Sequence, residues 1–308
     1  MPENWSVVGW QGVALRTPPD WNLVGVTGDE KKGYFRVDSP SSASLEVRWT
    51  ALRQPPRDLA ARAEEFLTAL KKVGRKRKVA FVSKVRPRKP TEAEARHGGS
   101  SVGFTWTADR RAYGRVLYCG YCKRLVVAQV VGESERELSG ASSQILGSIC
   151  EHEKPGWNLW ALYGFALPVP EAFRLQRHTL MSSFVELEFA ARGQRLLVQR
   201  WGLAANQLLK KRSFHEWLER SYLPGVTGYS VESRPAEGEH EAAVFSGDRT
   251  IARTALALPM ALWGRPVPRR MSGCAWFCAE SNKLFAIRHY SRGNDDLSSR
   301  LRQEIACH

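Results

Sequence analysis

Residues 5–49 read WSVVGWQGVALRTPPDWNLVGVTGDEKKGYFRVDSPSSASLEVRW, and a second version of this stretch occupies residues 157–201. At a constant offset of 152 residues, without a gap, ten of the 45 aligned positions are identical. In the first copy these positions are Trp5, Gly12, Ala14, Leu15, Pro18, Leu23, Thr27, Leu45, Arg48 and Trp49. Internal repetition on this scale predicts two units of one architecture.

The repetition continues to the end of each copy. Residues 123–129 (KRLVVAQ) are similar to residues 282–288 (NKLFAIR), and residues 143–150 (SQILGSIC) to residues 300–307 (RLRQEIAC). A chain of 308 residues is long enough for two domains, each with its own core. We therefore expect a first repeat over residues 1–153 and a second over residues 154–308.

Alternating apolar and polar residues predict short strands in both copies. In the first copy we expect strands at residues 12–18, 22–28, 33–39, 44–52, 77–87, 102–108, 114–121 and 123–132. Helices are expected at residues 59–73, with Asp58 as N-cap, and at residues 133–150. The second copy keeps this plan, with a strand at 250–258 and helices at 212–223 and 297–307. The predicted fold class is α+β: two tandem repeats of an antiparallel sheet covered by helices, in a pseudo-twofold arrangement.

Several of these segments resemble a known family. The opening LRTPPDWNLVGVTGD (residues 15–29), the strand LEVRW (residues 45–49), the central helix and a last helix ending in Ser148-Ile149 together resemble the PsbP-like (DcrB-like) α/β domain. The resemblance implies a domain that binds proteins or ligands and has no catalytic centre. The chain departs from the family in having no recognisable export signal and in carrying two copies.

The composition predicts a globular protein with a polyanionic partner. The formal net charge is +15, with 25 basic and 17 acidic residues in residues 1–153 and 21 and 14 in the remainder. An excess in both halves favours nucleic acid, an anionic membrane or an acidic protein as partner, although a basic balance also serves solubility. No apolar run is long enough to span a bilayer and no signal peptide is recognisable, so a cytoplasmic location is expected.

The basic excess is densest in one run, KKVGRKRKVAFVSKVRPRK, at residues 71–89. The run contains no acidic residue, and alternation along a strand would present its last cations on one face. Such a surface could bind several phosphates, or it could simply be solvated, with its first cations placed favourably at a helix C-terminus. The candidate polyanion-binding residues are Lys71, Lys72, Arg75, Lys76, Arg77, Lys78, Lys84, Arg86, Arg88 and Lys89.

Four residues of the first copy form a candidate zinc site. Cys119 and Cys122 lie at a predicted strand turn, and Cys150 and His152 follow the last helix. Cysteine and histidine are the ligands that structural zinc prefers, so a bound metal could join the helix to the sheet. The alternative is that these thiols are small buried apolar groups, with no cofactor at all.

The sequence contains no P-loop, dinucleotide-binding glycine motif, GxSxG or HExxH. This favours a non-catalytic protein that binds a macromolecule, as an adaptor, through a basic surface. Two alternatives stay open: a nucleic-acid-binding protein, for which tryptophans such as Trp106, Trp160 and Trp263 could supply stacking surfaces, and a duplicated ligand-binding protein or enzyme with a pocket between the repeats.

Overall fold

The computed structural model describes residues 5–76, 78–88, 95, 98–151, 154–250, 268–293 and 295–305, without the side chains of Cys150 and Glu151. The chain divides into two compact units, Met1–Gly164 and Phe165–His308. The boundary expected at residues 153 and 154 stays a prediction.

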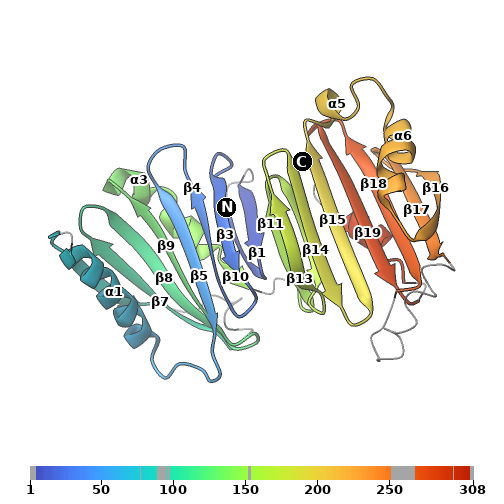
Figure 1. Ribbon diagram of the computed structural model, residues 1–308. Helices are drawn as coiled ribbons and strands as arrows, with labels where there is room; N and C mark the ends of the chain where they lie inside the picture. The colour runs from blue at the N-terminus through green and yellow to red at the C-terminus, as the bar shows by residue number, and fades with distance from the viewer. Residues whose placement is uncertain are drawn as a thin grey trace. The chain divides into compact units, whose positions relative to one another are not determined.

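The first unit contains a large antiparallel sheet of seven strands in the order β3-β4-β5-β9-β8-β7-β6 (Figure 1). The strands are β3 (Asn22–Gly28), β4 (Lys32–Asp38), β5 (Ser44–Ala51), β6 (Val82–Pro87), β7 (Ser100–Thr107), β8 (Arg111–Cys119) and β9 (Arg124–Gly132). Helix α1 (Leu59–Lys76) follows β5, and the short helices α3 (Glu135–Ser139) and α4 (Ser142–Gly147) follow β9. The same unit contributes β10 (Cys150–Glu151), β2 (Val13–Thr17), β1 (Ser6–Trp10) and β11 (Trp157–Leu162), in that order, to a small sheet.

The large sheet of the second unit has the same strand order, β13-β14-β15-β19-β18-β17-β16. Its strands are β13 (Arg174–Leu180), β14 (Phe184–Ala191), β15 (Gln194–Gly202), β16 (Tyr229–Ala236), β17 (Glu241–Arg249), β18 (Arg270–Cys278) and β19 (Lys283–Ser291), and β12 (Phe165–Pro170) precedes them. The sequence repeat is therefore a repeat of topology. Even a β-bulge recurs 152 residues on, between Leu23 and Gly25 in one copy and Leu175 and Arg177 in the other.

The helical segments of the second unit are short. They are α5 (Ala204–Gln207), α6 (Phe214–Trp217), the π-helix η1 (Leu218–Tyr222), the 3-10 helix η2 (Leu223–Gly225) and α8 (Leu297–Glu304). The side chains of Phe214, Trp217, Leu218 and Tyr222 fill the core against one face of the sheet. On the opposite face α8 packs on β18 and β19, and on β12.

The expectation of an α+β fold with helix-covered sheets is wrong. Three antiparallel sheets make up most of the described chain, and only α1 is a long helix. Helix α1 packs chiefly on the outer strands β6, β7 and β8, where Leu59, Ala63 and Leu67 are buried. The protein is thus mainly β, because its alternating segments pair into long ladders and short helices cover only parts of the faces.

Two expected helices also differ from the structure. The helix predicted over residues 133–150 is divided at Gly140 into α3 and α4, and the helix predicted over 212–223 passes from α-helix through a π-turn to a 3-10 turn. The strand expected at residues 250–258 lies, apart from Thr250, outside the described residues. In the part of the chain that the structure describes, we found no helix with the length and apolar character needed to span a membrane.

Candidate functional site

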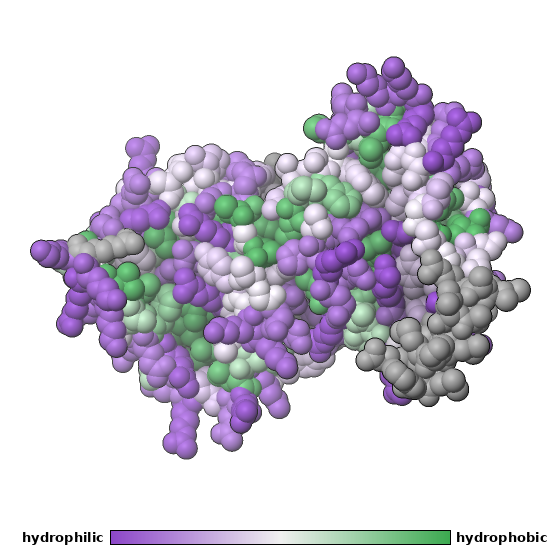
Figure 2. Space-filling model, viewed as in Figure 1, coloured by the Kyte–Doolittle hydropathy of each residue, from purple (hydrophilic) through white to green (hydrophobic). Residues whose placement is uncertain are grey.

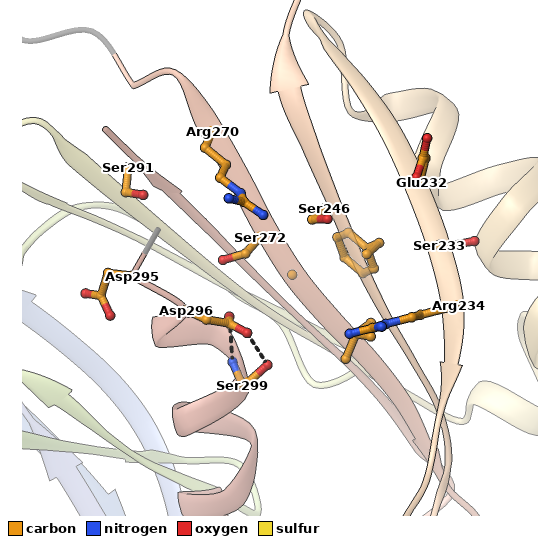
Figure 3. Close-up of a pocket in the computed structure, with 13 residues that line it drawn as sticks. Glu232, Ser233, Arg234, Ser246, Arg270, Ser272, Ser291, Asp295, Asp296 and Ser299 are labelled. Carbon is orange, nitrogen blue, oxygen red and sulfur yellow. Dashed lines mark hydrogen bonds between the residues drawn. The ribbon is translucent and has the colours of Figure 1, made fainter. Parts of the chain in front are cut away.

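Each unit has a pocket at the same place in its topology. In the second unit a pocket of about 410 Å³ lies over the outer strands β16, β17 and β18, beside the start of α8 (Figure 3). In the first unit a pocket of about 390 Å³ lies over β6, β7 and β8, beside α3 and α4. Each of these pockets is lined by residues of one unit alone, whereas the sequence-based alternative is a pocket between the repeats.

The strand ladders show which pocket residues correspond. Phe104 is paired with Gly114, and Phe245 with Gly273, in the matching strands of the two sheets. Counting from these pairs, Arg86 opposite Gly103 corresponds to Arg234 opposite Val244. Each pocket therefore has an arginine on the outermost strand at an equivalent position, and in both strands a proline follows it, Pro87 or Pro235.

Steric crowding explains why a glycine lies opposite each phenylalanine. A side chain at Gly114 would overlap the ring of Phe104, and a side chain at Gly273 would overlap the ring of Phe245. Both rings are buried, so they cannot easily move away. In both units the ring packs in the core on the sheet face opposite the pocket, so the same close approach of strands lies behind both pockets.

In the second unit the pocket is lined by charges of both signs. Figure 3 shows Arg234, Arg270 and Asp296 directed toward the same space from β16, β18 and the start of α8. Asp296 is held in place as the N-cap of α8: Oδ1 accepts from the Ser299 N–H at 3.2 Å and Oδ2 from the Ser299 hydroxyl at 2.6 Å. Burial raises the pKa of Asp296, but the hydrogen bonds from Ser299 and Ser298 outweigh it and lower the pKa below 3.8. The carboxylate is therefore charged at neutral pH and already engaged.

In the first unit the pocket is more basic and more apolar. Arg86 and Arg88 face Glu135 across a lining that includes Leu138. The Tyr113 hydroxyl donates a hydrogen bond to Glu135, which lowers the pKa of Glu135 and raises the pKa of Tyr113. This pocket can bind an acidic or amphipathic group, but its one carboxylate is already bonded to a tyrosine and an arginine, Arg111.

Among the described residues, the linings of these two pockets include no cysteine and no histidine. Cys274, the nearest thiol, lies behind the second pocket, and burial raises its pKa to about 12. It is 3.5 Å from the carbonyl oxygen of Ser298 in α8. The corresponding residue of the first unit, the buried Arg115, donates to the Leu146 carbonyl oxygen of α4 at 2.7 Å. Both side chains fasten a helix to the sheet.

The structure separates the predicted basic run into two groups. Eight of its ten cations are described and all eight are exposed: Lys71, Lys72, Arg75, Lys76, Lys78, Lys84, Arg86 and Arg88. Lys71, Lys72, Arg75 and Lys76 lie in the last turns of α1, and Lys78 follows the helix. Val85 of β6 packs against the α1 cluster and so directs Lys84 and Arg86 to the opposite face. Arg77 and Lys89 lie outside the described residues.

Only two of the four candidate zinc ligands, Cys119 and Cys122, have side chains in the described part of the chain. Cys119 is buried at the end of β8, and the Sγ of Cys122 accepts a hydrogen bond from Arg124 Nε at 3.3 Å. The Cys150 side chain and His152 lie outside the described part of the chain. Within that part, no three His, Cys, Asp or Glu side chains are grouped as metal ligands.

Of the three tryptophans named as candidate stacking surfaces, the two that lie in the described part of the chain are largely covered. Trp160 is 2% exposed, and Trp106 is half-buried with its indole N–H donating to Gln129 Oε1 at 3.0 Å. Trp263 is outside the described residues. Of the pocket residues, only Arg86 and Arg88 were among the sequence candidates, because strand register, which no sequence motif encodes, brings the others together.

No family model matches the chain, and no curated protein matches it significantly. Two solved structures align with it over nearly its whole length. The structure of the immunity protein TplEi of the T6SS from Pseudomonas aeruginosa, complexed with "L" peptide, is 12% identical, with 100% of this chain and 99% of that chain covered and a TM-score of 0.32. The crystal structure of the Tle4–Tli4 complex is 11% identical, with 99% and 97% covered and a TM-score of 0.29.

At such TM-scores the courses of the chains differ widely, so we infer neither fold nor function from these two proteins. The PsbP-like resemblance is not confirmed by any of these comparisons.

Proposed function

We propose that this protein is a non-catalytic binding protein whose partner is an acidic segment of another protein. The binding surface, which we name the basic edge, is formed by the end of α1 and by strand β6. Its residues are Lys71, Lys72, Val73, Arg75, Lys76, Lys78, Val82, Lys84, Arg86 and Arg88. In Figure 2 hydrophilic side chains project from the end of the first unit where Figure 1 places α1.

The observation that carries the proposal is that these cations are not neutralised. All eight are exposed, and none forms an ion pair with another described residue. Among the described residues, strand β6 is the last strand of its sheet and pairs with β7 alone. An edge strand of this kind can accept a further strand from a partner, whose acidic side chains would then meet Lys84 and Arg86.

Two exposed apolar side chains favour a protein partner over nucleic acid. Val73 is 53% and Val82 is 70% exposed, and both lie between the cations of the basic edge. Protein interfaces combine apolar contacts with a charged rim, whereas single-stranded nucleic acid is bound with aromatic stacking surfaces. The basic edge as defined combines exposed valines with cations, as a protein interface does, and its residues include no aromatic side chain.

The test is a binding titration of the full chain with fluorescent poly-L-glutamate and with single- and double-stranded oligonucleotides, at about 50 and 200 mM salt. We expect saturable binding of poly-L-glutamate that weakens with salt and is lost in a Lys76→Glu/Lys78→Glu/Lys84→Glu variant. The matched control is Lys210→Glu/Lys211→Glu/Arg292→Glu, which changes the net charge equally at exposed positions of the second unit.

The outcomes separate the alternatives. Tighter binding of either oligonucleotide than of poly-L-glutamate would replace the protein partner by nucleic acid. Equal loss of binding in both variants would show a response to net charge alone and would contradict a localised site. A Val73→Ser/Val82→Ser variant should weaken binding at both salt concentrations, because its contribution is not electrostatic.

A further inference from the structure

The second unit has another pocket, of about 510 Å³, on the sheet face opposite α8. Three arginines from three strands line it: Arg195 of β15, Arg249 at the end of β17 and Arg288 of β19. Two tyrosines, Tyr229 and Tyr290, complete this part of the wall. The proposed binding surface of the first unit does not include any of these residues.

The arginines are held in place by their neighbours. Arg195 is paired with Tyr290 across adjacent strands, and its guanidinium lies 5.1 Å from the centre of that ring. Tyr229 is paired with Arg249 in the same way on the other side of the pocket. The Arg288 guanidinium lies 5.1 Å from the ring of Tyr222, which is buried in the core. Fixed guanidinium groups lose little freedom when they bind a ligand.

In this arginine pocket, two of the three arginines have no carboxylate partner in the described part of the chain. Its lining contains no carboxylate among the described residues. Arg195 Nε pairs with Glu188 Oε1 at 3.0 Å, but neither Arg249 nor Arg288 forms an ion pair with a described residue. Arg249 Nη1 donates to the Pro268 carbonyl oxygen at 3.3 Å and Arg288 Nη2 to Gln199 Oε1 at 3.5 Å.

Each of these two arginines also has a buried donor without a partner. The Nε atoms of Arg249 and Arg288 are inaccessible to solvent and make no hydrogen bond with a described residue. Leaving a charged donor buried and unpaired is costly, and a bound ion is one way in which native structures account for such a group, although the Nε atoms of Arg110, Arg115 and Arg200 elsewhere in the chain share this property. An oxyanion in the pocket would accept charge-assisted hydrogen bonds from the other guanidinium N–H groups of Arg249 and Arg288, which line the pocket.

The first unit shows that the fold does not need these cations. Arg288 and Gln129 are equivalent, since they pair with the matching glycines Gly273 and Gly114. By the same ladders Arg195 corresponds to Ser44 and Arg249 to Ala108. The arginine pocket is therefore a specialisation of the second unit.

From this geometry we infer that the arginine pocket binds a small ligand through a phosphate or carboxylate group. The probes are inorganic phosphate and citrate, titrated calorimetrically into the full chain at constant ionic strength, with chloride as the reference anion. We expect saturable binding of one probe in preference to chloride, and the preferred probe distinguishes a phosphate ligand from a carboxylate ligand.

Arg249→Gln should weaken binding about tenfold or more, because it removes a charged hydrogen-bond donor. The matched control is Arg234→Gln, on the opposite face of the same sheet, which should bind as the native chain does. If Arg249→Gln does not fold, the NMR signal of the Arg249 Nε–Hε group of the native chain should shift on addition of the preferred probe. Binding no stronger than that of chloride, or equal weakening by both substitutions, would overturn the inference.

Discussion

At the scale of single residues, His289 shows how burial determines a titration. Its ring is inaccessible to solvent, with Nε2 2.9 Å from Gln194 Oε1 and Nδ1 3.2 Å from the Asp295 carbonyl oxygen. Burial lowers the pKa of His289 below 6.5, and the opposing effect of Asp295 is smaller. The side chain is therefore neutral in the folded protein where it would be protonated in the unfolded chain.

This difference predicts the pH dependence of stability. As the pH falls through 6.5, the unfolded state binds the proton first, so the free energy of unfolding decreases until the lowered pKa of the folded state is reached. A His289→Gln variant should lose part of this decrease, as measured by urea denaturation at a series of pH values. Burial also lowers the pKa of His178, so this histidine contributes a pH dependence of the same sign. The stability of the His178→Gln/His289→Gln variant should therefore change even less with pH. An unchanged slope in both variants would contradict the assignment.

Residue-scale properties divide into those that the sequence can predict and those that it cannot. Exposure of the cations at residues 71–88 follows from their charge, because an unpaired charge is rarely buried. The arginine pocket could not be predicted, because Arg195, Arg249 and Arg288 are far apart in the chain and meet only through strand order. The buried Arg115 likewise gives no sign of its role in the sequence.

At the scale of elements, strand register determines which face of the sheet a side chain occupies, even where the residue itself is the same in both copies. Trp49 and Trp201 occupy the same column of the gapless repeat, yet Trp49 pairs with Gly33 and Trp201 with Phe184, one position out of step with the repeat. A shift of one residue turns a side chain to the other face of the sheet. Accordingly Trp49 packs on Phe35, whereas Trp201 packs on Trp217 of the helical cover. The change of register arises from the turn between the two strands. Residues 192–193 connect β14 to β15, whereas residues 39–43 connect β4 to β5.

The strand pair that forms the wall of both pockets gives the element-scale prediction. Gly114→Ala and Gly273→Ala should each destabilise the protein by about 1 to 3 kcal/mol, since the added methyl would overlap a buried phenylalanine ring. Gly103→Ala is the control, because its nearest neighbours would be carbonyl oxygens at 3.8 Å. The measurement is chemical denaturation of the full chain. Equal effects of Gly103→Ala and Gly114→Ala would show that the loss comes from the strand glycine as such and not from the phenylalanine.

At the scale of the whole molecule, the sequence predicts the repeat. The first structural unit, however, includes β11, which belongs to the second sequence copy. Strand β11, 152 residues after β1, pairs antiparallel with it, and Gly9 lies opposite its own equivalent Ala161. A side chain at Gly9 would come within 2.8 Å of the Leu159 carbonyl oxygen, so the close approach requires a glycine. Trp10 and Trp160 pack edge to face with ring centres 5.0 Å apart. No alignment of the two copies shows this pairing, because it joins one copy to the start of the next.

These contacts predict how the chain can be cut. A fragment of residues 1–164 keeps β11 and the buried ring of Trp160, whereas a fragment of residues 1–153 loses both and uncovers Trp10, which is fully buried in the native chain. Removing a buried tryptophan typically costs about 3 kcal/mol or more. The longer fragment should therefore unfold at higher urea concentration, with its tryptophan fluorescence indicating a buried environment. A Trp160→Ala substitution in the longer fragment should reproduce most of the loss. Equal stability of the two fragments would place the boundary of the first unit at residue 153.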